Sequence, residues 1–336
     1  MLSIRSFRNS DPPTLVEIWR QFYSKEPQKV APIPLSVLVD NVLNMPFFES
    51  DGLFLAFDND LPVGFAHASF GPNGDQSDLN PETGVVHLIM TVPSYPDPVE
   101  LCRRLLEQCE EYLKNKGAKV IFGGPPRSSV SFYTGLYGGS EPIGVYESDA
   151  SITAYQDFGY SVQYNTLRFT RDLRNFQIPF TPKSVVWNRK LTINYSDKPP
   201  IENWFQACTA IRSNWFNATA TLGPQGQKLA EAHIRITQAD RSGCDVLIPP
   251  TAALVHIRVA DDFLRQGIGT FLLGGAIRRL TLEFHPSRIE TIVMQEEDHF
   301  VKFFRKLDWK EGDQGKVFLK ILQERRQSER TSPDPL

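Results

Sequence analysis

Cysteine is scarce in this sequence, with four in 336 residues: Cys102, Cys109, Cys208 and Cys244. No two of them form a C-x-x-C pair, so the spacing excludes a zinc knuckle, and four cysteines in a chain of this length make no disulfide framework. Cys102 and Cys109 lie seven residues apart within a helical pattern, which favours a packing role. The sequence therefore predicts no metal site and no disulfide-stabilised fold.

Excess positive charge and long apolar runs are also missing. The formal net charge is -3, which argues against a nucleic-acid binder that relies on bulk positive charge, although a local basic patch would still fit. No stretch approaches the roughly 20 apolar residues that span a bilayer, and the polar start MLSIRSFRNSDPPTL is unlike a signal peptide. We therefore expect a cytoplasmic protein with no nucleic-acid or membrane partner.

The length and the order of patterns indicate two similar halves. A chain of 336 residues suggests two domains at about 150 residues each. Both halves show the same order of predicted elements. Several strands come first, the last of them leads into a helix, and a further strand, a short helix and a final strand follow. The polar segment RNFQIPFTPKSV has no periodicity, so we place the domain boundary near 173–184, giving parts 1–175 and 183–325. The charged end predicts a disordered tail at 326–336.

Alternation and helical spacing predict the elements of both halves. In the first half we expect strands at 2–7, 51–70 (two strands around a turn), 83–92, 119–124 and 161–173, and helices from Pro12, at 98–118 and at 149–159. In the second half we expect strands at 184–195, 229–240, 251–260, 289–294 and 315–322, and helices at 200–216, 267–284 and 299–309.

Two glycines stand where the helix at 267–284 begins, in the run FLRQGIGTFLL. Glycine lowers helix stability by roughly 1 kcal/mol relative to alanine, so its presence needs a reason. The first turn of a helix has backbone N–H groups without partners and is the positive end of the helix dipole, and an anion satisfies both. Gly267, Ile268, Gly269 and Thr270 would offer four such amides, with Arg265 and Gln266 adding side-chain donors.

The spacing alone excludes two common phosphate motifs. No Gly-Lys-Ser/Thr follows, so the Walker pattern fails. The third glycine of the dinucleotide fingerprint is Leu272, and Glu290 precedes its strand where the ribose-binding acid should end one. A tight strand-to-helix connection without any ligand also fits two glycines.

The segment VHIRVADDFLRQGIGTFLL resembles the acetyl-CoA-binding motif of the GNAT acetyltransferases, in which a strand and Arg/Gln-x-x-Gly-x-Gly/Ala open a long helix. The resemblance extends to IETIVMQEEDHFVKFFRKLDW and, in the first half, to IRSFRNSDPPTLVEIW, LFLAFDNDLPVGFA and AYQDFGYSV. It implies an α+β fold of two tandem GNAT-like units, each a mixed, mainly antiparallel twisted sheet flanked by helices. This chain departs from the motif at Leu264, where the family has Arg or Gln.

By this resemblance the second half holds acetyl-CoA and the first half does not. The amides of Gly267 to Thr270, with Arg265 and Gln266, would bind the CoA pyrophosphate, and Ile257, Arg258 and Val259 would face the pantetheine and acetyl group. A splay between the strands 251–260 and 289–294 would admit the pantetheine. In the first half, Pro96, Asp97 and Pro98 occupy the motif region, where prolines remove N–H donors and the aspartate repels phosphate.

The catalytic groups are less clearly marked. The family's general acid is a tyrosine whose position here holds Phe304, which has no proton to donate, whereas the first half has Tyr155 at the matching position. His256 and Glu231 are candidate general bases, because a histidine titrates near neutrality, but a strand histidine and a solvated glutamate are the plainer interpretations. Glu296 and Glu297 are further candidates, or else cap the last helix.

These observations predict an acetyl-CoA-dependent N-acetyltransferase whose active site lies in the second half. The acceptor would be an amine on a small molecule or peptide, and the protein a monomer or homodimer. The alternative is a catalytically weak or inactive acyl-CoA-binding, sensing or interaction protein. In that case Phe304 and Leu264 would be substitutions that accompanied the loss of catalytic activity.

Overall fold

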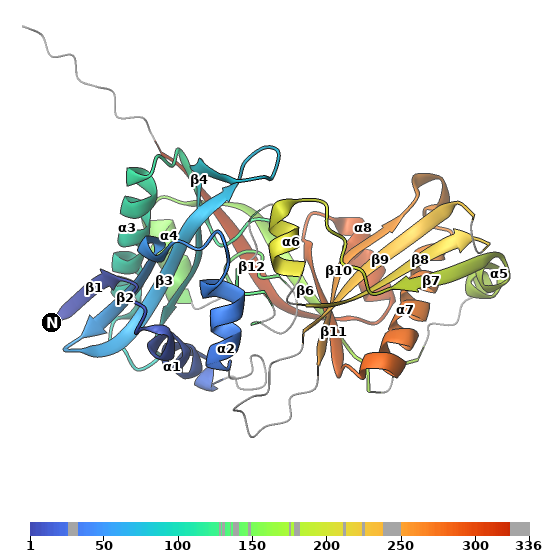
Figure 1. Ribbon diagram of the computed structural model, residues 1–336, viewed down its shortest axis with the longest axis horizontal. Coiled ribbons are helices and arrows are strands. Elements are labelled where there is room, and N and C mark those ends of the chain that lie inside the picture. Colours follow the sequence, from blue (N-terminus) through green and yellow to red (C-terminus); the bar gives the residue numbers. More distant parts are fainter. Residues whose placement is uncertain are drawn as a thin grey trace, which may run out of the picture.

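A single mixed sheet of 12 strands forms the frame of the molecule in the computed structural model (Figure 1). Helices flank the sheet in both halves of the chain, so the predicted α+β class is confirmed. The structure describes residues 1–25, 33–127, 129, 132–134, 136, 141–146, 149–174, 176–177, 182–210, 213–223, 226–237 and 250–322. The tail predicted at 326–336 lies outside these residues.

The elements of the first half follow the predicted order closely. They are β1 (Leu2–Ser6), α1 (Pro12–Phe22), α2 (Leu35–Leu38), β2 (Leu53–Asp58), β3 (Leu61–Pro72), β4 (Leu79–Thr91), α3 (Pro98–Asn115), β5 (Val120–Gly123), α4 (Asp149–Asp157) and β6 (Ser161–Asp172).

The second half repeats this order after one additional helix. Its elements are α5 (Pro182–Lys190), β7 (Leu191–Ser196), α6 (Trp204–Ala210), β8 (Asn214–Leu222), β9 (Lys228–Thr237), β10 (Thr251–Val259), α7 (Ile268–Phe284), β11 (Arg288–Met294), α8 (Asp298–Lys306) and β12 (Lys310–Ile321).

Two predicted elements were wrong in their bounds or type. The strand expected at 184–195 is the helix α5 as far as Lys190, and only the last part is strand β7. The helix expected at 200–216 ends at Ala210, and Trp215 and Phe216 lie in strand β8. Long-range packing decides both cases, because α5 packs on α7 and the aromatic run in β8 pairs with β7 and β9.

The two halves exchange their last strands within the sheet. The strand order is β1-β2-β3-β4-β5-β12-β6-β11-β10-β9-β8-β7. Strand β12, from the end of the chain, pairs antiparallel with β5 of the first half, and β6 of the first half pairs antiparallel with β11 of the second. The sheet is therefore continuous across both halves. The boundary predicted at 173–184 lies between β6 and α5 and stays a prediction.

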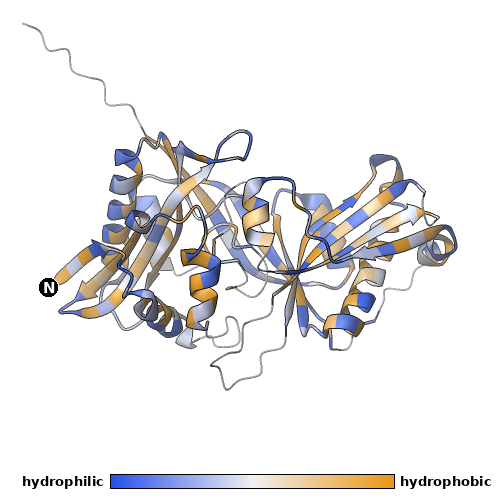
Figure 2. Ribbon diagram, viewed as in Figure 1, coloured by the Kyte–Doolittle hydropathy of each residue, from blue (hydrophilic) through white to orange (hydrophobic). Residues whose placement is uncertain are grey.

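Each half has its own apolar core between the sheet and its helices. In the first, residues such as Trp19 of α1 and Leu105 of α3 are buried against the strands. In the second, Leu272 and Ile277 of α7 and Phe304 of α8 do the same. Hydrophilic and hydrophobic residues alternate along the helices (Figure 2), as expected for helices with one buried face. No helix among the described residues is long and apolar enough to cross a membrane.

Candidate functional site

The glycine turn predicted from the sequence is the N-terminus of α7. Gly267 is the N-cap residue in the left-handed conformation, with φ at 88°, and no side chain caps the helix there. Arg265, two residues earlier, also has a positive φ of 60°. The backbone amides of the first turn therefore have no side-chain acceptor, which leaves the positive end of the helix dipole open to an anion.

Helix α5 holds this turn from the other side. The indole Nε1 of Trp187 donates to the carbonyl oxygen of Gln266 at 2.8 Å, and Lys183 Nζ donates to that of Arg265 at 3.2 Å. The side chain of Gln266 turns back and donates to the carbonyl oxygen of Asp262 at 3.1 Å. These bonds fix a stretch of backbone that includes a left-handed, non-glycine residue.

A cavity of about 650 Å³ opens beside the turn, within the size range of a small-molecule site. The residues that line it are Ile257, Arg258, Val259, Asp261, Phe263, Leu264, Arg265, Gly267, Ile268, Gly269, Thr270, His299, Phe300, Phe303 and Lys306. Eight of the nine predicted cofactor-binding residues are in this set, the exception being Gln266. Phe303 and Lys306 were not predicted to lie here, because α8 reaches the cavity only through tertiary packing.

Strands β10 and β11 separate beyond this cavity. Their parallel pairing extends only from Thr251 to Ala253 on β10, although β10 continues to Val259 and β11 to Met294. A β-bulge follows at Val255, where the register against β9 shifts, and Thr291 Oγ1 donates to the carbonyl oxygen of Leu254 at 2.9 Å where the strands part. The expected splay between these strands is therefore present.

A second, small cavity of about 40 Å³ lies where the strands part. Ala253, Leu254 and Val255 of β10 line it with Ile292 of β11, and two residues of the first half, Glu141 and Ile143, complete it. The two cavities thus follow one another along β10, from the start of α7 to the bulge.

His256 belongs to a cluster on the side of the sheet that faces away from α7. Its ring centroid lies 5.2 Å from that of His233 on β9, and His233 Nε2 lies 3.5 Å from a carboxylate oxygen of Glu231. Loss of solvent and the neighbouring His233 lower the pKa of His256 below the ordinary value of 6.5. His256 is therefore neutral at pH 7 and able to accept a proton.

Glu231 is less suited to that role. Burial alone would raise the pKa of its carboxyl group, but its hydrogen bond with Lys228 and the nearby His233 and His256 hold the pKa below the ordinary value. A carboxylate with a lowered pKa is a weaker base and a better partner for a histidine. His233 was missed by the sequence analysis, although its place two residues after Glu231 puts both side chains on one face of β9.

The other residues considered for catalysis make packing contacts or hydrogen bonds within the protein. Tyr155 is buried in the core of the first half, where its ring stacks on Phe318 with centroids 5.1 Å apart, and it does not line either cavity of the second half. Phe304 is buried against Phe169 of β6. Glu297 accepts from Arg127 at 2.8 Å and from the Met294 amide at 3.2 Å, so it joins α8 to its surroundings.

The first half differs from the second at the corresponding helix. Asp97 is the N-cap residue of α3, and its carboxylate accepts from the Glu100 amide at 3.0 Å. An acidic side chain thus caps the N-terminus of α3, whereas the equivalent N-terminus of α7 has no side-chain cap.

The corresponding bulge of the first half, in β4, is surrounded by buried side chains that contact one another. The bulge of β4 falls at His87, just after its parallel pairing with β5 ends. His87 Nε2 lies 2.6 Å from Ser69 Oγ, and His67 Nδ1 lies 3.0 Å from the hydroxyl of Tyr133. All four side chains are buried, together with Phe132.

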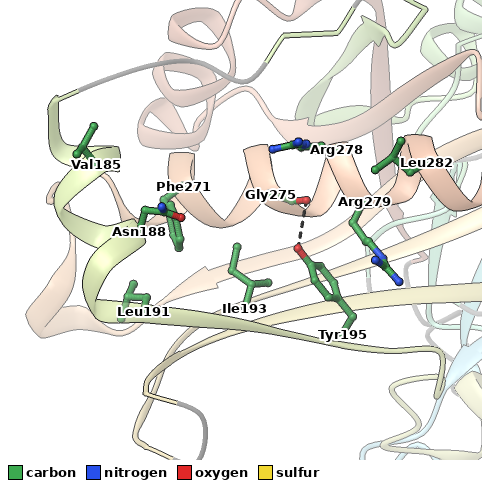
Figure 3. A pocket seen from close by; sticks show the side chains of 10 residues that line it. All are labelled: Val185, Asn188, Leu191, Ile193, Tyr195, Phe271, Gly275, Arg278, Arg279 and Leu282. Carbon is green, nitrogen blue, oxygen red and sulfur yellow. Dashed lines mark hydrogen bonds between the residues drawn. The ribbon is translucent and has the colours of Figure 1, made fainter.

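A further cavity of about 610 Å³ lies between α5, β7 and α7 (Figure 3). The hydroxyl of Tyr195 crosses it to donate to the carbonyl oxygen of Gly275 at 3.3 Å, and Arg278 and Arg279 stand along the helix above. None of the predicted site residues lines it. It abuts the middle of α7, where backbone N–H groups are used within the helix, so it lacks the open amides of the first cavity.

Comparisons with solved structures identify the fold. The chain is similar to a tandem GNAT protein from the clavulanic acid biosynthesis pathway (TM-score 0.65, 10% identity, 95% of this chain and 98% of the other). It is also similar to a GCN5-related N-acetyltransferase from Sphaerobacter thermophilus (TM-score 0.61, 10% identity, 95% of each chain). The fold is therefore that of tandem GNAT proteins, as the resemblance implied.

A third similar structure is part of a larger protein. It is the GCN5-related glucosamine N-acetyltransferase region of a fungal multi-domain β-N-acetylglucosaminidase (TM-score 0.66, 15% identity), of which this chain covers 38% while 95% of this chain is matched. No family model matches the chain, and no curated protein matches its sequence.

Proposed function

We propose that the protein is an acetyl-CoA-dependent N-acetyltransferase whose active site lies in the second half. One observation carries this proposal: the uncapped N-terminus of α7 opens on a cavity lined by the end of β10, and a second cavity lies further back along β10, where β10 and β11 separate. The similarity of the fold to a tandem GNAT protein and to a GCN5-related N-acetyltransferase supports it.

The residues at the turn fit a diphosphate. The amides of Ile268, Gly269 and Thr270 lie in the first turn, and Arg265 supplies a cation beside them. Phe303 and Val259 are the nearest side chains to the space that a Cβ on Gly269 would enter, at 3.5 Å each. A Cβ there would be in ordinary van der Waals contact with these two side chains, both of which line the cavity.

The reacting end would lie at the bulge. A thioester that extends along Ile257 would bring its acyl group to Val255 and the cavity of about 40 Å³. This volume exceeds the roughly 10–15 Å³ that one water molecule needs, and it accommodates an acetyl group better than a long acyl chain.

His256 is the side chain best suited to receive the amine proton. Once the nitrogen lone pair is free, the nitrogen attacks the carbonyl carbon, and the new C–N bond forms as the C–S bond breaks. After the attack the acylated nitrogen releases its second proton to solvent, and solvent protonates the departing thiolate, because Phe304 has no proton to give. His233 and Glu231 would hold His256 in place.

Thiol release tests this proposal. Free CoA is measured while the protein is incubated with acetyl-CoA and a panel of amines that includes glucosamine, the acceptor named for one similar structure. Acetyl-CoA consumption that depends on an amine supports the enzyme. Acetyl-CoA binding without consumption supports the alternative of an acyl-CoA-binding or sensing protein, which Leu264 and Phe304 favour. Absence of binding would contradict both.

A further inference from the structure

Glu141 brings a carboxylate from the first half of the chain into the second. It lies between β5 and α4, and its Oε1 accepts from Arg235 Nη1 of β9 at 3.0 Å. The Arg235 side chain is 2% exposed, whereas that of Glu141 is 34% exposed. A buried guanidinium needs a nearby anion, and Glu141 provides it while one side of its carboxylate stays accessible.

The Glu141 carboxylate lies at the bulge of β10, where the proposed reaction would take place. Glu141 lines the cavity of about 40 Å³ together with Val255 at the bulge of β10 and Ile292 of β11. The residue that follows Val255 is His256, the proposed proton acceptor. A group bound against Glu141 would therefore lie beside both the bulge and the histidine cluster.

The chemistry of the carboxylate suits a cation. An ionised carboxylate has about four acceptor positions on its two oxygens, so one hydrogen bond from Arg235 leaves capacity for further donors. A protonated amine presents up to three N–H donors and a positive charge, and a charge-assisted hydrogen bond is roughly twice as strong as a neutral one.

We propose that Glu141 binds the ammonium group of the acceptor and so selects protonated amines over neutral ones. The inference rests on the proposed function, because it places the acceptor nitrogen next to the position proposed for the acetyl group. The bound ammonium then gives one proton to His256, which frees the lone pair for attack on the acetyl carbon. On this account the first half of the chain determines acceptor specificity.

A purely structural role for Glu141 makes a different prediction. A second contact between the halves exists nearby, the ion pair of Arg127 with Glu297 at 2.8 Å. If Glu141 only joined the halves, its loss would resemble the loss of Arg127, and it would not distinguish a charged acceptor from a neutral one. Arg127→Gln is therefore the matched control for Glu141→Gln, which keeps the size and a hydrogen-bond acceptor at position 141.

The experiment compares benzylamine, which is protonated at pH 7, with aniline, which is neutral. KM and kcat for both are measured with saturating acetyl-CoA in the wild type, Glu141→Gln and Arg127→Gln. We expect Glu141→Gln to raise KM for benzylamine about tenfold or more while KM for aniline changes less than about twofold. We expect Arg127→Gln to leave the ratio of the two KM values unchanged. Equal changes for both acceptors, or no change for benzylamine, would overturn the proposal.

A second measurement does not depend on turnover. Millimolar benzylamine should raise the Tm of the wild type and of Arg127→Gln but not that of Glu141→Gln, and aniline should not discriminate among the three. An equal shift in all three proteins, or none in any, would overturn the role of Glu141. If the wild type shows the benzylamine shift yet consumes no acetyl-CoA with any amine, the proposed enzyme fails while the ammonium site stands.

Discussion

Trp187 donates its indole N–H to the carbonyl oxygen of Gln266 at 2.8 Å, so a helix that begins the second half of the chain fixes the turn that opens α7. Trp187→Phe keeps an aromatic ring but removes this donor. A lost hydrogen bond changes free energy by about 0.5–1.5 kcal/mol. We therefore expect the Kd for acetyl-CoA, measured by calorimetry, to rise about two- to tenfold.

Trp204→Phe is the control for that substitution. Trp204 begins α6 and contacts Phe47 and Phe205, and it does not line the cavity at Gly267. Its replacement should leave the Kd unchanged. An effect on Kd as large as that of Trp187→Phe would mean that loss of any indole disturbs the site, and the account of the turn would be wrong.

Leu264 is the position where this chain departs from the GNAT motif, and its side chain lines the cavity while being exposed to solvent. Leu264→Arg adds a cation beside the proposed diphosphate. Exposed ion pairs contribute about 0.2–1 kcal/mol and weaken with salt. The variant should bind acetyl-CoA about two- to fivefold more tightly at low salt, with the gain lost at 1 M NaCl. Unchanged affinity at low salt would place the diphosphate elsewhere.

The proposed role of His256 predicts how kcat/KM depends on pH. Because its pKa lies below 6.5, kcat/KM for a neutral acceptor such as aniline should be level down to pH 6.5 and fall only at lower pH. His256→Gln should lower kcat about 100-fold, as is usual for a general base, and should abolish this acid limb, while the Kd for acetyl-CoA stays the same. A variant that keeps both its rate and its acid limb would exclude His256 as the proton acceptor.

The buried histidine His67 links stability to pH. Burial lowers its pKa from 6.5 to about 3 in the folded protein. Between these values the unfolded chain binds a proton that the native protein does not, so the free energy of unfolding falls as pH decreases from about 6.5 to about 3, by about 1.4 kcal/mol per pH unit. Urea unfolding at several pH values measures this slope.

His67→Gln serves as the comparison, because it removes the titrating ring and keeps a side chain that can bond Tyr133. Its slope should be smaller than that of the wild type in the same window. Identical slopes in the wild type and in His67→Gln would show that His67 is protonated in the native protein or titrates as it does when unfolded.

The parts of the site that come from one stretch of chain could be predicted from the sequence. The strand, the glycine turn and the helix at 251–284 are contiguous, so their pattern determines the cavity wall from Ile257 to Thr270. These features depend on local geometry, which periodicity and glycine positions encode.

Other parts depend on contacts between distant segments. Helix α5 has β-branched residues that favour a strand, and its packing on α7 is a contact that the local pattern does not show. Nothing in the pattern of 310–321 indicates that β12 pairs with β5 of the first half. Glu141 gave no signal either, because its contact with Arg235 joins residues 94 positions apart.

The stoichiometry of CoA binding tests the central claim most directly. Titration calorimetry with acetyl-CoA should give one binding site per chain, because Asp97 already caps the first half's helix while Gly267 leaves that of the second half open. Gly269→Glu, which places a negative charge at the turn, should abolish this binding without lowering Tm by more than a few degrees. Binding that persists in Gly269→Glu, or a wild type that binds no acetyl-CoA, would contradict the account.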